Sequence, residues 1–376
     1  MKEIFSRVNQ YLFFFVLAVV VMYFGRSFII PIVFAALLAM LMAPLCRKLD
    51  SWGFPRALST LTCVLILAAV VVGMGVIIGA QIATFGKDID KIKQKGTEIV
   101  AKGKDYIEKR YGVSEEKQEQ VVKEQAKKAQ ESQTQSKGGG NIVTKLLSGV
   151  TSAVAGIILT LVFTFLFIFS KEKYESFFLR LYKDKDQGEV KKVVGDISRV
   201  AQKYLTGRAM SITIIWILYS IGLSIVGIKN AILLAGVAAL LTLIPYVGTV
   251  LGGLFPVFMA LVTEDSMQPA LMAVLVMFLI QTMDNYFIEP NIVGGEVSLS
   301  ALTSILSIIA GGMIWGVAGM ILFLPMMGIV KIICDHVDPL KPIGFVIGDP
   351  DAKKPSKITQ WVKEKLHIGT KKKSRG

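Results

Sequence analysis

The chain is short of the residues that build metal centres and nucleophilic active sites. Its two histidines are His336 and His367, and its three cysteines are Cys46, Cys63 and Cys334, without any C-x-x-C spacing. So few ligands argue against a metal cluster, a disulfide framework or a Ser/His/Asp triad. A G-x-x-x-x-G-K-[ST] phosphate loop is also missing, which argues against ATP hydrolysis by this chain. We therefore expect no enzymatic activity, no catalytic or metal-binding residues and no cofactor.

Charge is missing from long stretches of the sequence. No Asp, Glu, Lys or Arg occurs between Arg208 and Lys229, from 230 to 263 or from 297 to 330, and 53% of all residues are hydrophobic. About 20 apolar residues cross the roughly 30 Å hydrocarbon core of a bilayer, where charged side chains are unfavourable. The pattern predicts an all-α, polytopic membrane protein with about eight transmembrane spans. We place the spans at about 11–25, 28–46, 57–85, 146–170, 209–228, 231–262, 267–288 and 298–330.

The first apolar stretch has the basic flank of a signal peptide, since Lys2 and Arg7 precede it. No small-residue cleavage site of the A-x-A kind follows, because the residues after Gly25 are Arg, Ser and Phe. We therefore expect a retained first span.

The net charge of +14 is carried by loops and tails. No folded basic module is visible, so nucleic acid is not an expected partner. Lys and Arg gather after residue 46, within 171–208 and after residue 330, and the positive-inside rule places these segments and both termini in the cytoplasm. We expect a multi-pass protein of the prokaryotic plasma (inner) membrane. Anionic lipid is the expected partner of an amphipathic helix at 189–205, whose polar face is basic.

The sequence divides into membrane-spanning and water-facing parts. These are spans 1–3 at 1–86, an external segment at 87–141, span 4 at 142–170, a cytoplasmic amphipathic helical segment at 171–208, spans 5–8 at 209–335 and a basic cytoplasmic tail at 336–376. The external segment has loosely helical apolar spacing and then a Gln-, Lys- and Ser-rich stretch with little apolar surface to offset the entropy of ordering. It is either a solvated spacer or a docking arm for a partner.

The uncharged run 230–263 is longer than one span needs. It contains Pro245, Tyr246 and Gly248, and the loss of an amide donor at the proline predicts a broken helix between Pro245 and Gly248. Broken backbone at membrane depth survives where it is buried in protein or lines a wet cavity, and transporters use such breaks as binding elements. These residues are therefore candidates for a transport path. An ordinary proline kink filled by its neighbours is the alternative.

The uncharged run 297–330 is equally long and is rich in glycine. Its candidate hinge or packing residues are Gly311, Gly312, Gly316, Gly319 and Pro325. Small residues four apart let helices approach closely, so packing is the default interpretation of Gly312-x-x-x-Gly316 and of Gly248-x-x-x-Gly252. For both long runs a kinked span and a re-entrant hairpin remain open.

Polar and acidic side chains gather between Gln281 and Pro290, at the expected outer end of the seventh span. The transport-path candidates here are Asp284, Asn285, Glu289 and Pro290. An ionisable residue inside a membrane marks a substrate or ion pathway by default. Asp284 lies close to a predicted span boundary, so a water-exposed side chain at a helix end is the alternative.

These residues resemble a known family. The order and spacing of Ile244-Pro245-Tyr246-Val247-Gly248, of Asp284-Asn285 with Glu289-Pro290 and Gly294, and of Gly316 to Gly319 with Pro325 are similar to the autoinducer-2 exporter family, the PerM-like permeases. The resemblance covers nearly the whole chain. One departure is Ala301, where many members have proline, so the local helix start is expected to differ.

The resemblance implies export of a small polar solute by a homo-oligomer; autoinducer-2, a quorum-sensing signal, names the family. Some members are described as sodium/proton antiporters, which makes a monovalent cation the alternative solute. A third hypothesis is a non-transporting scaffold that displays residues 87–141.

Overall fold

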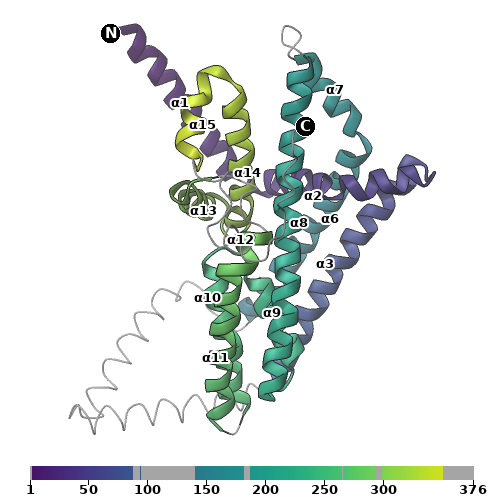
Figure 1. The fold of residues 1–376 in the computed structure, drawn as a ribbon, viewed down its shortest axis with the longest axis vertical. Helices are drawn as coiled ribbons and strands as arrows, with labels where there is room; N and C mark the ends of the chain where they lie inside the picture. The colour runs from purple at the N-terminus through teal and green to yellow at the C-terminus, as the bar shows by residue number, and fades with distance from the viewer. Residues whose placement is uncertain are drawn as a thin grey trace, which may run out of the picture. The chain divides into compact units, whose positions relative to one another are not determined.

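A computed structural model describes residues 2–87, 94, 140–181, 187–264, 266–292 and 299–349. Most of the segment 87–141, together with Gly294, Glu296 and the tail beyond 349, lies outside these residues. The described part is helical apart from turns and one isolated bridge between Leu299 and Gly348 (Figure 1). The expected all-α membrane fold is confirmed.

The chain forms two compact units, one of residues 1–19, 171–208 and 287–376 and one of residues 20–170 and 209–286. The second unit holds α2 (Arg26–Ser51), α3 (Arg56–Lys87), α6 (Gly140–Phe169), α9 (Ala231–Leu241), α10 (Val247–Thr263) and α11 (Gln268–Met283). The first unit holds α7 (Lys171–Leu181), α12 (Glu289–Ile292), α13 (Ala301–Trp315), α14 (Val317–His336), a 3₁₀ turn (Asp338–Leu340) and α15 (Lys341–Ile347). Two helices, α1 (Lys2–Phe24) and α8 (Gln187–Val226), contribute to both.

Helix α8 is a single helix of 40 residues. The amphipathic segment 189–205 and the span 209–228, expected as separate elements, are therefore one helix, because no proline interrupts the sequence between them. One face of it is buried at every third or fourth position. These positions are Ala201, Tyr204, Arg208, Ser211, Ile215, Tyr219 and Leu223.

The run 230–263 folds as a helical hairpin, α9 and α10. Its break is confirmed between Pro245 and Gly248, since α9 ends at Leu241 and α10 begins at Val247. A Cβ added to Gly248 would collide with the Leu241 carbonyl oxygen, and one added to Gly252 would lie 2.6 Å from the Ala238 carbonyl oxygen. Each contact joins residues equidistant from the turn, so α10 packs antiparallel to α9.

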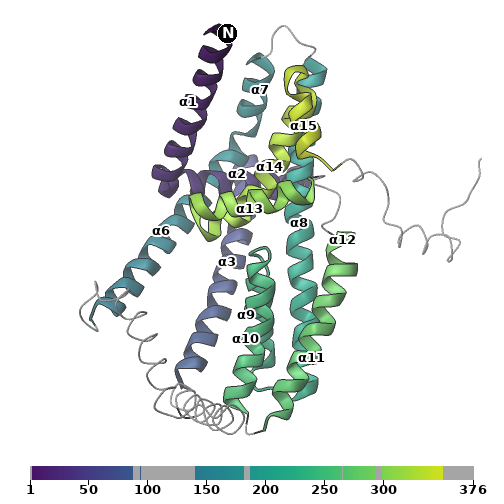
Figure 2. The ribbon, with the colours of Figure 1, turned by 90° about the vertical axis from the view of Figure 1, so that its left-hand side faces the viewer.

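The two ends of this hairpin lie together. The Lys229 amide donates a hydrogen bond to Glu264 Oε1 at 3.3 Å, just before α9 and just after α10. A kinked span would instead place its ends on opposite sides of the membrane. The run is therefore a helical hairpin, and Figure 2 shows α9 and α10 side by side.

The run 297–330 also folds back, as α13 and α14. Gly316 forms the turn with a φ of 63°, a left-handed value that favours glycine. Gly311 and Gly319 pack against each other's carbonyl groups, and the Trp315 and Phe323 rings meet edge to face at 5.3 Å. Pro325 lies inside the unbroken α14.

The beginning of α13 is hydrogen-bonded to the end of α15, the last described helix of the first unit. The Ser300 amide donates to the Ile347 carbonyl at 3.0 Å, and Ser300 Oγ caps α13 by accepting from the Thr303 amide at 3.2 Å. Ala301 is thus the first residue of α13, a position where proline is also favoured. The helix therefore begins at the position where many members of the resembling family have proline.

Five helices of the described chain are long and apolar enough to cross a membrane, or six when the bent pair 153–169 and 171–177 counts as one span. One of the five is α14, Val317–His336, from the second hairpin, whereas α9, α10 and α13 are shorter apolar helices.

Candidate functional site

The segment after α11 has a wider helical turn than its neighbours. Residues Asp284–Ile288 form a π-helical run, η1, between α11 and α12. Pro290 follows it, and a proline cannot donate to the carbonyl four residues earlier and clashes with it in an α-helix. Widening the turn is one way to relieve that clash, and π-helical turns occur often at functional sites.

A polar chain of side chains links this run to α8. The Tyr219 hydroxyl donates to Gln281 Oε1 at 3.1 Å. The Gln281 amide donates to Asn285 Oδ1 at 3.3 Å and, at 3.5 Å, to Asp284 Oδ2. Tyr219 is fully buried and Asp284 is only 3% exposed. The alternative of a water-exposed Asp284 at a helix end is therefore wrong, and the structure brings Asp284 and Asn285 into one cluster.

Ser211 is a buried hydroxyl on the same face of α8. It lies two helical turns before Tyr219, and among the described residues its Oγ has no hydrogen-bond partner. Hydroxyls in apolar helices usually bond to a carbonyl one turn earlier. Thr213 and Ser220 of α8 do so, at 2.9 and 2.7 Å. The Ser211 hydroxyl can therefore donate or accept a further hydrogen bond on the face of α8 that contains Tyr219.

The tip of the α9–α10 hairpin lies at about the depth of Asp284. Helices α10 and α11 pack against each other. They are joined by a short loop, because α10 ends at Thr263 and α11 begins at Gln268. With 17 and 16 residues, each extends roughly 25 Å at about 1.5 Å per residue. Val247 and Asp284 are thus similarly far from that connection.

The hairpin tip has a strained backbone. Tyr246 has φ 61° and ψ −56°, and the Val247 amide donates to the Pro245 carbonyl at 2.7 Å. This is a γ-turn of the rare, positive-φ form. Strain of this kind in a non-glycine residue is a pointer to function. Pro245, Tyr246 and Gly248 therefore stay candidates at the broken end of two helices.

An ion pair lies beyond the polar chain along the same helices. Arg208 Nη1 is 3.7 Å from Glu289 Oε1, with the Arg208 side chain largely buried and that of Glu289 50% exposed. Glu289 thus lies at the Arg208 end of α8, beside the basic segment 171–208. Because of this ion pair, a cytoplasmic segment 171–208 and an acidic segment at the outer end cannot both hold, and the side that each faces stays a prediction.

The remaining candidates do not join the cluster. Gly311, Gly312 and Gly319 pack α13 against α14, and Gly312 meets Met320. Gly316 forms the turn between α13 and α14 with a positive φ, and Pro325 is fully buried within α14.

Sequence reasoning missed Tyr219 and Ser211. The available signal was their spacing, since both share a helix face with Arg208 inside an otherwise uncharged run. Only the pairing of α8 with α11 shows that this face meets Asp284.

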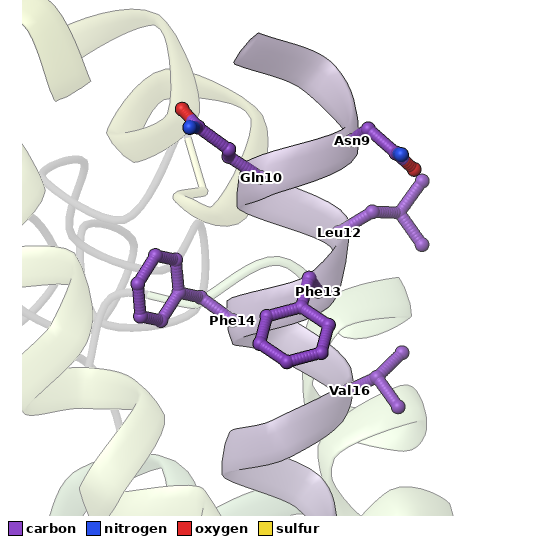
Figure 3. Close-up of a pocket in the computed structure, with 6 residues that line it drawn as sticks. All are labelled: Asn9, Gln10, Leu12, Phe13, Phe14 and Val16. Carbon is purple, nitrogen blue, oxygen red and sulfur yellow. The ribbon is translucent and has the colours of Figure 1, made fainter. Parts of the chain in front are cut away.

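A hollow of about 510 Å³ runs along α1 and is lined by Asn9, Gln10, Leu12, Phe13, Phe14 and Val16 (Figure 3). All six side chains come from one helix, and most of them are exposed apolar groups. Gln10 and Phe14 point to one side of α1 and Asn9, Leu12 and Val16 to the other. This surface suits lipid or another membrane helix better than a polar solute.

Comparison with known proteins decides the family. The model of the AI-2E family transporters matches residues 12–338. The chain belongs to the AI-2E transporter family. It is 27% identical over 316 residues to YueF of Bacillus subtilis (strain 168), which is named as a transport protein. The matched residues cover 82% of this chain and 84% of YueF.

YhhT of Escherichia coli (strain K12), named in the same way, is 24% identical over 192 residues, or 50% of this chain and 53% of YhhT. The matched range of the AI-2E model contains the α9–α10 hairpin, the Asp284 cluster and the α13–α14 hairpin. The protein is accordingly a membrane permease.

Proposed function

We propose that this AI-2E transporter exports a small, uncharged polar solute that binds beside Asp284. The observation that carries the proposal is a carboxylate that is 3% exposed and tied to Gln281 within an apolar helix. Burial of a charged group away from water is unfavourable unless polar partners compensate it, and transporters use such groups for their solutes.

The cluster has the donors and acceptors that a hydroxyl-bearing solute needs. The Asp284 carboxylate accepts hydrogen bonds from solute hydroxyls. The Asn285 amide and the Ser211 hydroxyl each donate and accept. Tyr219 acts through Gln281, which it orients by its hydrogen bond at 3.1 Å. The hairpin tip at Tyr246, at similar depth, contributes backbone groups that a continuous helix would keep satisfied.

The second candidate function is sodium/proton antiport. The same buried carboxylate favours it, because Asp284 is the type of group that binds a proton or a monovalent cation at membrane depth. The two functions differ in whether net solute flux needs an ion gradient.

The test is solute flux in proteoliposomes, measured by light scattering during osmotic swelling with xylitol as the probe. Asp284→Asn should lower xylitol flux about 10-fold or more, since hydrogen bonds to charged groups contribute about 1.5–3 kcal/mol. The melting temperature of the purified protein should stay the same or rise, because the variant buries no charge. Asp338→Asn is the matched control, since Asp338 is an exposed carboxylate paired with Lys341.

Wild-type flux in Asp284→Asn would remove Asp284 from the site. Loss of folded protein would make Asp284 a packing partner instead. If neither protein moves xylitol, but the wild type alone acidifies or alkalises the lumen under a sodium gradient, antiport replaces export.

We also propose a plasma-membrane location with both termini in the cytoplasm and residues 87–141 outside. The gathering of Lys and Arg in 171–208 and after 330 supports this orientation. In a background without Cys46, Cys63 and Cys334, an impermeant thiol reagent should label Gln130→Cys in intact cells but not Thr370→Cys. The reverse pattern would invert the topology.

Association into a homo-oligomer, with anionic lipid around it, is part of the same proposal. The exposed apolar side chains of α1 support it, among them Phe13, Phe14 and Phe15. The mass of the particle in native membrane extracts measures the oligomeric state directly.

A further inference from the structure

Gln81 and Gln281 both lie in apolar helices of the second unit, and they differ in their surroundings. Gln281 exchanges hydrogen bonds with Tyr219, Asp284 and Asn285. Gln81 of α3 is 4% exposed, and neither its amide oxygen nor its amide nitrogen has a hydrogen-bond partner in the described part of the chain. A primary amide offers two donors and two acceptor positions, so leaving all of them unmade in an apolar bundle is strongly unfavourable.

The place of Gln81 follows from its neighbours on α3. Ile77, one turn earlier on the same face, contacts α9, since a Cβ added to Gly236 would lie 3.1 Å from Ile77 Cγ2. That Cβ would also lie 3.2 Å from Trp216 Nε1, which donates to the Ile232 carbonyl at 3.1 Å. Gln81 is thus on the face of α3 that packs against α9.

Gln81 lies toward the end of the unit where the α9–α10 hairpin begins. In Figures 1 and 2, α3 descends toward the end at which α8 stops and α9 starts. The hairpin tip and Asp284 lie at the other end of α9, which has 11 residues, or roughly 16 Å of helix. The two polar groups therefore mark different depths on the two sides of one hairpin.

We infer that the Gln81 amide is a second binding station for the transported solute, at the hairpin's entrance, and that it takes an uncharged, hydroxyl-bearing molecule. This inference rests on the proposed function. A hydroxyl group both donates and accepts, which matches the two halves of the amide. A cation would leave the amide N–H groups unmatched, so the station favours the exported polar solute over sodium.

Binding at Gln81 requires water and solute to reach it in another state of the transport cycle. The hairpin provides a means, because α9 contacts α3 through Gly236 and the apolar side chain of Ile77. A movement of α9 away from α3 exposes the amide, and its return buries the amide again.

The first experiment replaces the amide by an apolar side chain of similar size, Gln81→Leu. The melting temperature should rise by about 2 °C or more, because an unsatisfied amide is removed from an apolar contact. Xylitol flux in proteoliposomes should fall about fivefold or more, because the solute loses one hydrogen-bonding group. Higher stability together with lower flux is expected only for a group that is kept for binding.

The second experiment does not depend on transport. In a background without Cys46, Cys63 and Cys334, a small water-soluble methanethiosulfonate should modify Gln81→Cys, and xylitol should slow that modification. The matched control is a variant that keeps Cys63 as its single cysteine, and it should react much more slowly, because Cys63 lies on the same helix but is fully buried against α2 and α6.

Each other outcome overturns the inference. Wild-type flux in Gln81→Leu, with Gln81→Cys unreactive, leaves the amide an isolated buried group. A lower melting temperature in Gln81→Leu shows that the amide has a structural partner. If wild-type protein moves no xylitol, the proposed function fails, and an unprotected or absent reaction of Gln81→Cys then rejects the station independently.

Discussion

The two glycine-based hairpins, α9–α10 and α13–α14, have the same packing but different turns. In both, a glycine on one helix lies against a backbone carbonyl of the other, through Gly248 and Leu241 in the first and Gly311 and Gly319 in the second. The second turns at a single glycine, Gly316, with φ 63°. The first turns through Tyr246, whose φ of 61° is unfavourable for a side chain.

The difference between the two turns distinguishes the residues that fold a hairpin from those that form a functional site. A glycine at the turn is enough to fold α13 onto α14, so a strained tyrosine is not required to make a hairpin in this chain. The strained turn lies at about the depth of Asp284, whereas the relaxed turn belongs to the unit that contains no part of the Asp284 cluster. We therefore connect the Tyr246 turn with transport and the Gly316 turn with packing.

The largest effect is expected from substitutions that remove the close glycine–backbone packing common to both hairpins. Gly248→Ala and Gly319→Ala should each lower the free energy of unfolding by about 3 kcal/mol or more, because the added methyl group meets backbone that cannot rotate away. Gly253→Ala is the control, since nothing lies within 4 Å of the position of its added Cβ. Thermal unfolding of the detergent-solubilised variants measures the effect. Equal stability of Gly248→Ala and Gly253→Ala would show that close approach does not hold α9 to α10.

A smaller effect, of opposite sign in the two hairpins, tests the turns. Gly316→Ala should destabilise the protein by about 1–3 kcal/mol, because alanine disfavours this backbone conformation. Tyr246→Gly should leave stability equal or raise it by about 1 kcal/mol, since glycine relieves the positive φ. Xylitol flux should fall in Tyr246→Gly if the strain serves transport. Destabilisation by Tyr246→Gly would mean that the tyrosine side chain, not its backbone, fixes the tip.

The smallest effect concerns a single hydrogen bond of the first turn. Thr249 Oγ1 donates to the Tyr246 carbonyl at 2.7 Å. Thr249→Val keeps the shape and should lower stability by about 1 kcal/mol, the usual net contribution of one hydrogen bond. Thr213→Val, which removes a bond to the carbonyl one turn earlier in α8, provides the comparison within a regular helix. A smaller loss for Thr249→Val than for Thr213→Val would show that this bond does not hold the turn.

Local sequence information was sufficient for several features of the site. Pro245 and Gly248 predicted the broken helix because each changes the backbone at its own position. Asp284 and Asn285 stood out because polar residues are rare within apolar helices. The pairing of Glu289 with Arg208 was not predicted, since counting spans placed the two residues at opposite ends of the bundle. A hairpin and a kinked span have the same composition, and they are distinguished by the contacts of Gly248 and Gly252 with α9 and by the bond from Lys229 to Glu264.

The sequence by itself determined that this protein is a helical membrane protein. The polarity of each residue decides whether it is stable in the bilayer, and the bilayer requires every backbone group to be hydrogen-bonded within its helix. Only the tertiary structure decided which polar residues meet. Tyr219 and Gln281 are 62 positions apart along the chain and join at 3.1 Å because α8 and α11 pack antiparallel. The tertiary structure also decided that the Gln281 amide has hydrogen-bond partners, whereas the Gln81 amide has none in the described part of the chain. Whether a buried amide has a partner depends on the neighbouring helices and not on its own segment.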